Sequence, residues 1–233
     1  MKLKDLFQNL ALGELSSSSL VEIGQFEIDK KQLPKVIHAT NQALEYFYST
    51  FPLKIGEVTI RLSEGISRYY LDYDYASSNP EAIIKYIMDT HDKPFENDVL
   101  HILQVKSMNG YSYPLNDTFV TTAIHTPEYN CVQITDSIQD KFLVVTYQAG
   151  HPLIPLTEPM NSNFAIQIPS SYRTALQTYV ACLVLQNMGG NHINESNALF
   201  AKFKTLTEEL KLQGIGTVTQ TGINIKPMLR GWV

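Results

Sequence analysis

The stretch "LQNMGGNHINES", residues 185–196, decides how the C-terminal half of the chain folds. Apolar side chains recur every three or four residues before it, from 172 to 188, and again after it, from 199 to 210. This spacing is typical of helices with one apolar face. Because only a few residues separate the two segments, we expect two long helices that run antiparallel.

The stretch itself contains residues that suit a turn between helices. Gly189 and Gly190 stand where the first helix ends, and glycine readily takes the positive φ needed there. Asn194 or Ser196 can cap the start of the next helix. The alternative is a ligand-binding loop, but every residue here has a structural role, so we interpret the stretch as a turn.

The N-terminal half also shows helical spacing. Residues 33–52 carry a long apolar face between Pro34, which suits a first helical turn, and Pro52, which ends the segment. Residues 3–12 predict a short amphipathic helix that ends before Gly13. The helical part of the fold is therefore expected at both ends of the chain.

Alternation of apolar and polar residues predicts strands between these helices. Residues 57–62 alternate as a half-buried strand, and residues 69–71 are expected to return beside them as a hairpin. Residues 80–89 are expected to form a short helix after Pro80. Further strands are predicted at 99–105, 130–135, 141–149 and 163–168. Because residues 142–147 are apolar on both faces, that strand is expected to be central.

These patterns predict an α+β fold, an antiparallel helical bundle with a β-rich insertion and an extended C-terminal arm. The expected divisions are 1–94 for the N-terminal helices and β-hairpin of the bundle, 95–168 for the β-rich insertion, 169–213 for the antiparallel helical pair and 214–233 for the arm. A chain of 233 residues is long enough to bury a substantial core in this way.

The bulk composition excludes several classes of protein. With 44% hydrophobic and 18% charged residues the chain is typical of folded proteins. A net charge of −5 does not suit a protein that grips nucleic acid through its overall field. We find no signal peptide and no apolar run near the roughly 20 residues of a membrane span, so we expect a protein made in the cytoplasm that needs no membrane. Cys131 and Cys182 do not form a disulfide framework.

Catalytic or metal-binding patterns are weak. No two of the six histidines share the spacing of metal ligands; His91, Asp92 and His101 are the best candidates for convergence, and scattered surface positions explain them more simply. His125 with Cys131 and Glu128 is the best candidate for a cysteine-dependent enzyme, but Cys131 reads as a small buried side chain. We expect no enzyme, no cofactor and no metal.

A second alternative is a module that binds single-stranded nucleic acid. It rests on exposed aromatic stacking by Tyr69, Tyr70, Tyr73 and Tyr75 and on the lysines near the N-terminus, Lys2, Lys4, Lys30, Lys31 and Lys35. Few basic residues flank the tyrosines, so we expect the tyrosines to be half-buried against a neighbour instead, either within the fold or across a subunit interface.

Four stretches resemble head-to-tail adaptor, or connector, proteins of short-tailed bacteriophages: "TNQALEYFYSTFPLK" at 40–54, "EGISRYYL" at 64–71, "FLVVTYQAGHP" at 142–152 and "IPSSYRTALQTYVACLVLQNMGG" at 168–190. They span most of the chain and are packing patterns without catalytic signatures. Another phage neck or tail ring protein is the nearest alternative within this resemblance.

The resemblance implies a structural virion protein at the neck, the head–tail junction. Family members form a ring of twelve copies below the portal protein, continue the channel for genomic DNA and receive a tail tube or nozzle protein. The acidic balance suits a channel through which DNA slides without specific binding. By analogy with the family, the arm is expected to contact the portal or an adjacent subunit through its apolar residues Ile223, Ile225, Met228, Leu229 and Trp232.

Overall fold

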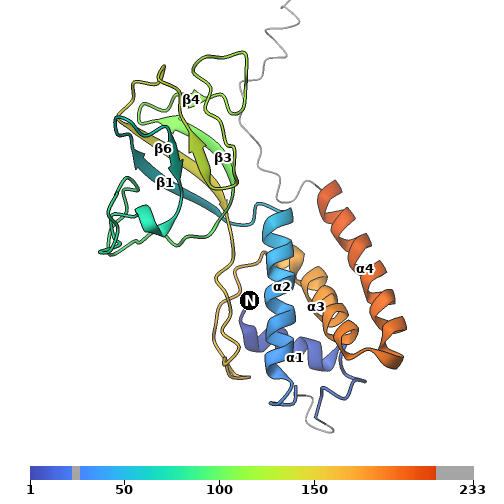
Figure 1. Cartoon of the computed structure of the whole chain (residues 1–233). Coiled ribbons are helices and arrows are strands. Elements are labelled where there is room, and N and C mark those ends of the chain that lie inside the picture. Colours follow the sequence, from blue (N-terminus) through green and yellow to red (C-terminus); the bar gives the residue numbers. More distant parts are fainter. Residues whose placement is uncertain (23–26, 214–233) are drawn as a thin grey trace, which may run out of the picture.

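The computed structural model describes residues 1–22 and 27–213, and it has an α+β fold (Figure 1). Four α-helices are α1 (Leu3–Leu12), α2 (Leu33–Thr50), α3 (Arg173–Met188) and α4 (Ile193–Leu212). The strands are β1 (Ile55–Arg61), β2 (Arg68–Tyr70), β3 (Val99–Ser107), β4 (Ser112–Tyr113), β5 (Cys131–Gln133) and β6 (Phe142–Ala149). The helices and the strands have separate hydrophobic cores.

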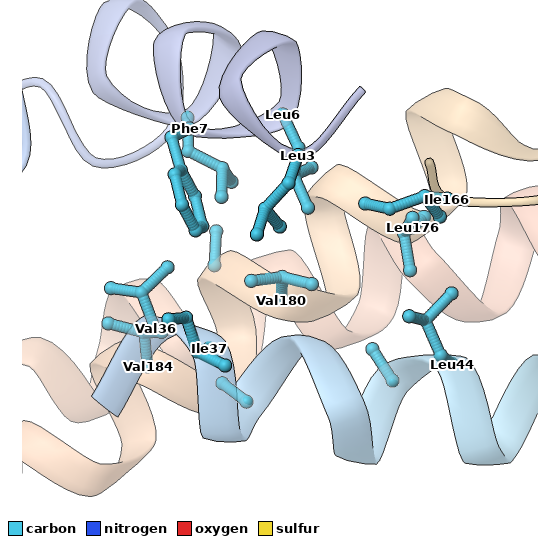
Figure 2. Close-up of a cluster of buried hydrophobic side chains, with 14 of the residues drawn as sticks. Leu3, Leu6, Phe7, Val36, Ile37, Leu44, Ile166, Leu176, Val180 and Val184 are labelled. Carbon is cyan, nitrogen blue, oxygen red and sulfur yellow. The ribbon is translucent and has the colours of Figure 1, made fainter. Parts of the chain in front are cut away.

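We call residues 1–22, 27–53 and 151–213 the helical part, and residues 54–150 the sheet part. Helix α3 is the centre of the helical part, since α1, α2 and α4 all contact it. Figure 2 shows Leu3, Leu6 and Phe7 of α1 directed toward side chains of α2 and α3. Because α3 is covered on several sides, its buried residues do not form a single stripe; Thr178 and Cys182 are buried as well as Leu176, Val180 and Val184.

The turn between α3 and α4 has the predicted form. Gly189 and Gly190 have φ values of 66° and 56°, and the short 3-10 turn Gly190–His192 leads into α4. The predicted cap is wrong, because His192 occupies the position before α4 and no side chain caps it. Ser196 instead lies inside α4, where its hydroxyl donates to the carbonyl of Cys182 at 3.0 Å and ties the two helices together.

The main sheet has four antiparallel strands in the order β1-β6-β3-β4. Strand β6 lies between β1 and β3, so the predicted central strand is confirmed. Its apolar residues include Leu143 and Val145, which are fully buried. A second, two-stranded sheet pairs β2 with β5.

The predicted hairpin of residues 57–62 and 69–71 is wrong. Strand β1 pairs with β6, and β2 pairs with β5. Alternation identifies a strand but not its partner, and here both partners lie far along the chain. Since β1 belongs to the main sheet, the sheet part begins near residue 54, and the expected boundary between residues 94 and 95 falls inside it.

Two further elements differ from prediction. Residues 80–89 form turns and bridges in place of a helix, with Ile87 bridged to Ile60 beside β1. Residues 163–168 form no strand; they lie beside residues 1–3 at the start of the chain, where Ala165 is bridged to Lys2. Ile166 and Ile168 are buried in the helical core, which explains their apolar character. The expected β-rich segment 95–168 therefore ends near residue 150.

Candidate interaction surfaces

The candidate catalytic residues of the sheet part do not assemble a nucleophilic site. His125 lies opposite Gln133 in a backbone bridge, and among the described residues it forms no hydrogen bond with Cys131. The Glu128 carboxylate accepts a hydrogen bond from Tyr70 at 3.1 Å. Burial, with the nearby charge of Glu128, raises the pKa of the Cys131 thiol. A raised thiol pKa disfavours the thiolate that a nucleophile requires.

The candidate metal ligands His91, Asp92 and His101 are all exposed. Within residues 1–22 and 27–213, no group of three or more His, Cys, Asp or Glu side chains could hold a metal ion. Both cysteines are free and buried. The described residues therefore offer no metal or disulfide site on which a function could be built.

The tyrosine cluster is part of the sheet core. Tyr86 stacks on Tyr75 with ring centroids 4.7 Å apart, and it meets Tyr69 edge-on at 5.0 Å. Tyr69 is buried and Tyr70 and Tyr75 are half-buried, whereas Tyr73 is exposed. The expectation that these tyrosines pack within the fold is confirmed for Tyr69 and Tyr75, and the stacking face of Tyr75 is occupied.

The candidate partner-binding residues Ile223, Ile225, Met228, Leu229 and Trp232 lie in the arm, outside the described residues. Their proposed contacts stay predictions. The surfaces available for partners are therefore considered on the helical and sheet parts.

The chain passes between the helical part and the sheet part twice, near residues 54 and 150, and polar contacts hold this joint together. The side chain of Gln148 donates to the carbonyls of Ser49 and Phe51 at 3.3 Å each and to that of Tyr48, at the C-terminal end of α2. The ammonium of Lys54 bridges Glu96 at 2.6 Å and Asp98 at 2.7 Å. Nearby, burial lowers the pKa of His151, whose ring packs against Tyr48. These contacts fix the start of the sheet against the end of α2.

Among the described residues, the most exposed large apolar side chain is at the tip of residues 77–89, which we call the Ile83 loop. Ile83 is 98% exposed, Ile84 50% and Met88 46%. The base of this loop is held by Asp89, which accepts hydrogen bonds from the amides of Ser78 and Phe95 at 2.8 and 2.9 Å. On another loop of the sheet part, Phe119 is 96% exposed. A single exposed side chain such as Phe119 is ordinary, whereas several apolar side chains on one loop, as in the Ile83 loop, make that loop a candidate contact site.

A groove lies on the helical part between the start of α2 and the end of α3. Its volume is about 630 Å³, and Leu20, Val184 and Met188 give it an apolar lining. Lys35 and His38 line it as well, as does Gln32, whose buried Oε1 has no hydrogen-bond partner among the described residues. We call it the α2–α3 groove.

Neither of these surfaces was predicted from the sequence. Ile83, Ile84 and Ile87 suit one face of a helix, and the structure shows that only Ile87 is buried. The one available signal was the pair "NP" at residues 79–80, which favours a turn over a helix. The groove is formed by residues far apart in the sequence, which no local pattern brings together.

Comparison with models of known protein families and with curated proteins finds no match in either. Within the described residues, no helix combines the length and the apolar character that crossing a membrane would require. Function is therefore argued from the architecture and from these surfaces.

Proposed function

We propose that the protein is a head-to-tail adaptor of a bacteriophage, a structural component that forms a ring below the portal and docks the tail. The observation that carries the proposal is the division of the chain into a helical part and a sheet part with separate cores. Figure 1 shows the two parts at opposite ends of an elongated molecule. An adaptor meets different proteins at its two ends, and each part supplies its own surface.

The finer architecture belongs to the same proposal. We propose that the helical part is a bundle, that the sheet part is an insertion between α2 and α3, and that residues 214–233 form an arm toward the portal or an adjacent subunit. The sheet part starts and ends beside one point, since Ile55 and Gln148 are paired across β1 and β6. This arrangement is what an insertion requires.

The charge distribution supports a channel function. Residues 54–150 contain 13 Asp and Glu but 7 Lys and Arg, so the sheet part carries most of the negative charge. We expect this part to face outward or toward the tail and not to line the channel. The acidic balance of the whole chain still suits a ring through which DNA slides, whereas a basic balance would hold the phosphates. Among the described residues, the candidate catalytic and metal-binding side chains do not come together at one site, and this supports a structural role over catalysis.

The test is to measure the mass of the purified protein by analytical ultracentrifugation, alone and mixed with the portal protein encoded near it. We expect a stoichiometric ring on the portal, and deletion of residues 217–233 should weaken it because the apolar arm is lost. A chain that ignores the portal at every concentration would overturn the proposal. Salt-dependent binding of single-stranded DNA would then favour the nucleic-acid module.

A further inference from the structure

We infer that the Ile83 loop of one copy docks into the α2–α3 groove of a neighbouring copy. The inference rests on the proposed ring, because it states how adjacent subunits in that ring would touch. It is carried by two kinds of complementarity between the loop and the groove, in apolar surface and in charge.

The loop is built to hold apolar side chains out in water. Besides Asp89, Asn79 fixes its shape: the Asn79 side chain donates to the Tyr73 carbonyl at 3.2 Å and accepts from the Glu81 amide at 3.0 Å. Ile83 nevertheless points into solvent. A loop ordered before binding loses less entropy when a partner covers its tip, so this shape favours association.

The groove offers a matching apolar surface. Leu20, Val184 and Met188 line it, and it is large enough, at about 630 Å³, to take more than one aliphatic side chain. Covering Ile83 and Ile84 there would remove apolar area from water on both partners. This burial is the main driving force of most protein association.

The charges of the loop and the groove match as well. The loop carries Glu81, Lys85 and Asp89, and the Lys85 ammonium donates to the Ser77 carbonyl at 3.5 Å within its own copy. Glu81 stands two residues before Ile83 and is exposed, while Lys35 and His38 line the groove. Within the described residues Glu81, Lys35 and His38 form no ion pair.

The groove and the loop of one chain are far from each other. The groove lies at the start of α2, whereas the sheet part follows the end of α2, at the opposite end of that helix (Figure 1). A chain therefore cannot fill its own groove with this loop, and in the inferred contact the occupant is the loop of another copy. Two different surfaces that meet in this way form a head-to-tail contact, which closes into a ring when the rotation between copies allows it.

The test is disulfide trapping between two variants that each carry one added cysteine. Ile83→Cys protein is mixed with Met188→Cys protein that carries a tag of different mass, under mild oxidation, with and without the portal protein. The native cysteines are buried, and wild-type protein controls for them. A matched control replaces Ile83→Cys with Phe119→Cys, since Phe119 is equally exposed on the sheet part.

We expect the mixed Ile83–Met188 dimer to form at least about tenfold faster than the Phe119 control, because docking gives the two thiols a high effective concentration. Glu81→Lys in the first protein should reduce this rate, and Lys35→Glu in the second should restore part of it. Equal rates for the two pairs, or no response to the charge reversals, would overturn the inference.

The outcomes separate this inference from the proposed function. Rings on the portal without the specific disulfide would overturn the contact and leave the adaptor role standing. The specific disulfide in a protein that ignores the portal would support the contact and overturn the adaptor role. If neither forms at high protein concentration, both fall.

Discussion

The helical and sheet parts bury their apolar side chains in different ways. In the helical part, α3 is surrounded mainly by aliphatic and aromatic groups that meet by shape, and the hydroxyl of buried Tyr48 donates to the Gln167 carbonyl. In the sheet part, buried tyrosines also carry hydroxyls that need partners: Tyr86 receives a hydrogen bond from the Tyr70 amide at 2.8 Å and donates to the Tyr70 carbonyl at 3.0 Å. Filled volume therefore dominates around α3, whereas around Tyr86 a pair of hydrogen bonds is added to the filled volume.

The largest effect is expected where volume is lost in the helical part. Leu176 is fully buried in α3, and Leu176→Ala should lower the free energy of unfolding by about 3 kcal/mol, because lost burial adds to the cavity left behind. Urea denaturation followed by circular dichroism measures it. Leu212→Ala is the control, since Leu212 is 87% exposed. A loss below about 1 kcal/mol would show that the helices repack freely.

A smaller effect is expected where a hydroxyl is lost in the sheet part. Tyr86→Phe keeps the ring but leaves the Tyr70 amide and carbonyl without their partner, which should cost about 2 kcal/mol. Tyr46→Phe is the matched control in the helical part, because the Tyr46 hydroxyl forms no hydrogen bond with another described residue. Thermal unfolding measures both variants. If Tyr86→Phe and Tyr46→Phe lose the same stability, the hydrogen bonds of Tyr86 do not distinguish the sheet part from the helical part.

Acid should weaken the sheet part through Asp89. Burial alone would raise the pKa of Asp89, but hydrogen bonds from Ser78 and Phe95 outweigh it and hold the pKa below its ordinary value. A lowered folded-state pKa gives stability that is present above about pH 4 and is lost as the pH falls through the folded pKa. Asp89→Asn should cost about 1 kcal/mol at pH 7. The difference between variant and wild type should narrow below about pH 4, and a constant difference down to pH 2.5 would contradict this assignment.

The smallest effect is expected at the joint. Lys54→Met removes both ion pairs of Lys54. Glu96 is 63% exposed, so water screens its pair with Lys54. We therefore expect the free energy of unfolding to fall by only about 0.5 kcal/mol. High salt should lower wild-type stability toward that of the variant. A loss of several kcal/mol would mean that the joint, and not the two cores, determines how the parts unfold.

Sequence patterns predicted the helices well and the sheet poorly, for a physical reason. The bounds of α1 and α2 follow from local spacing and from Gly13 and Pro52, residues that act within a few positions of where they stand. The pairing of β1 with β6 joins residues far apart, and no local signal carries that information. The same limit hid the α2–α3 groove, which α2 and α3 form only once they are packed together.

The misplaced helix at residues 80–89 shows a second limit. Ile83, Ile84 and Ile87 have helical spacing, yet Ile87 is held beside β1 while Ile83 is left in water. In a sequence, an apolar residue is usually interpreted as part of the core. A residue that contacts a partner protein is often apolar as well, so residue type does not separate the two. Spacing alone therefore could not distinguish a core helix from an exposed binding loop.

The pairing of Ile55 with Gln148 places the two ends of the sheet part side by side. In terms of chain connectivity the whole sheet part is then a loop between α2 and α3, and the cost of closing a loop rises only slowly with its length. A different module, longer or shorter, could be exchanged at this point without moving the helices. The joint is thus a point at which the sheet part could be exchanged. The binding surface of the sheet part can then change while the arrangement of the helices stays the same.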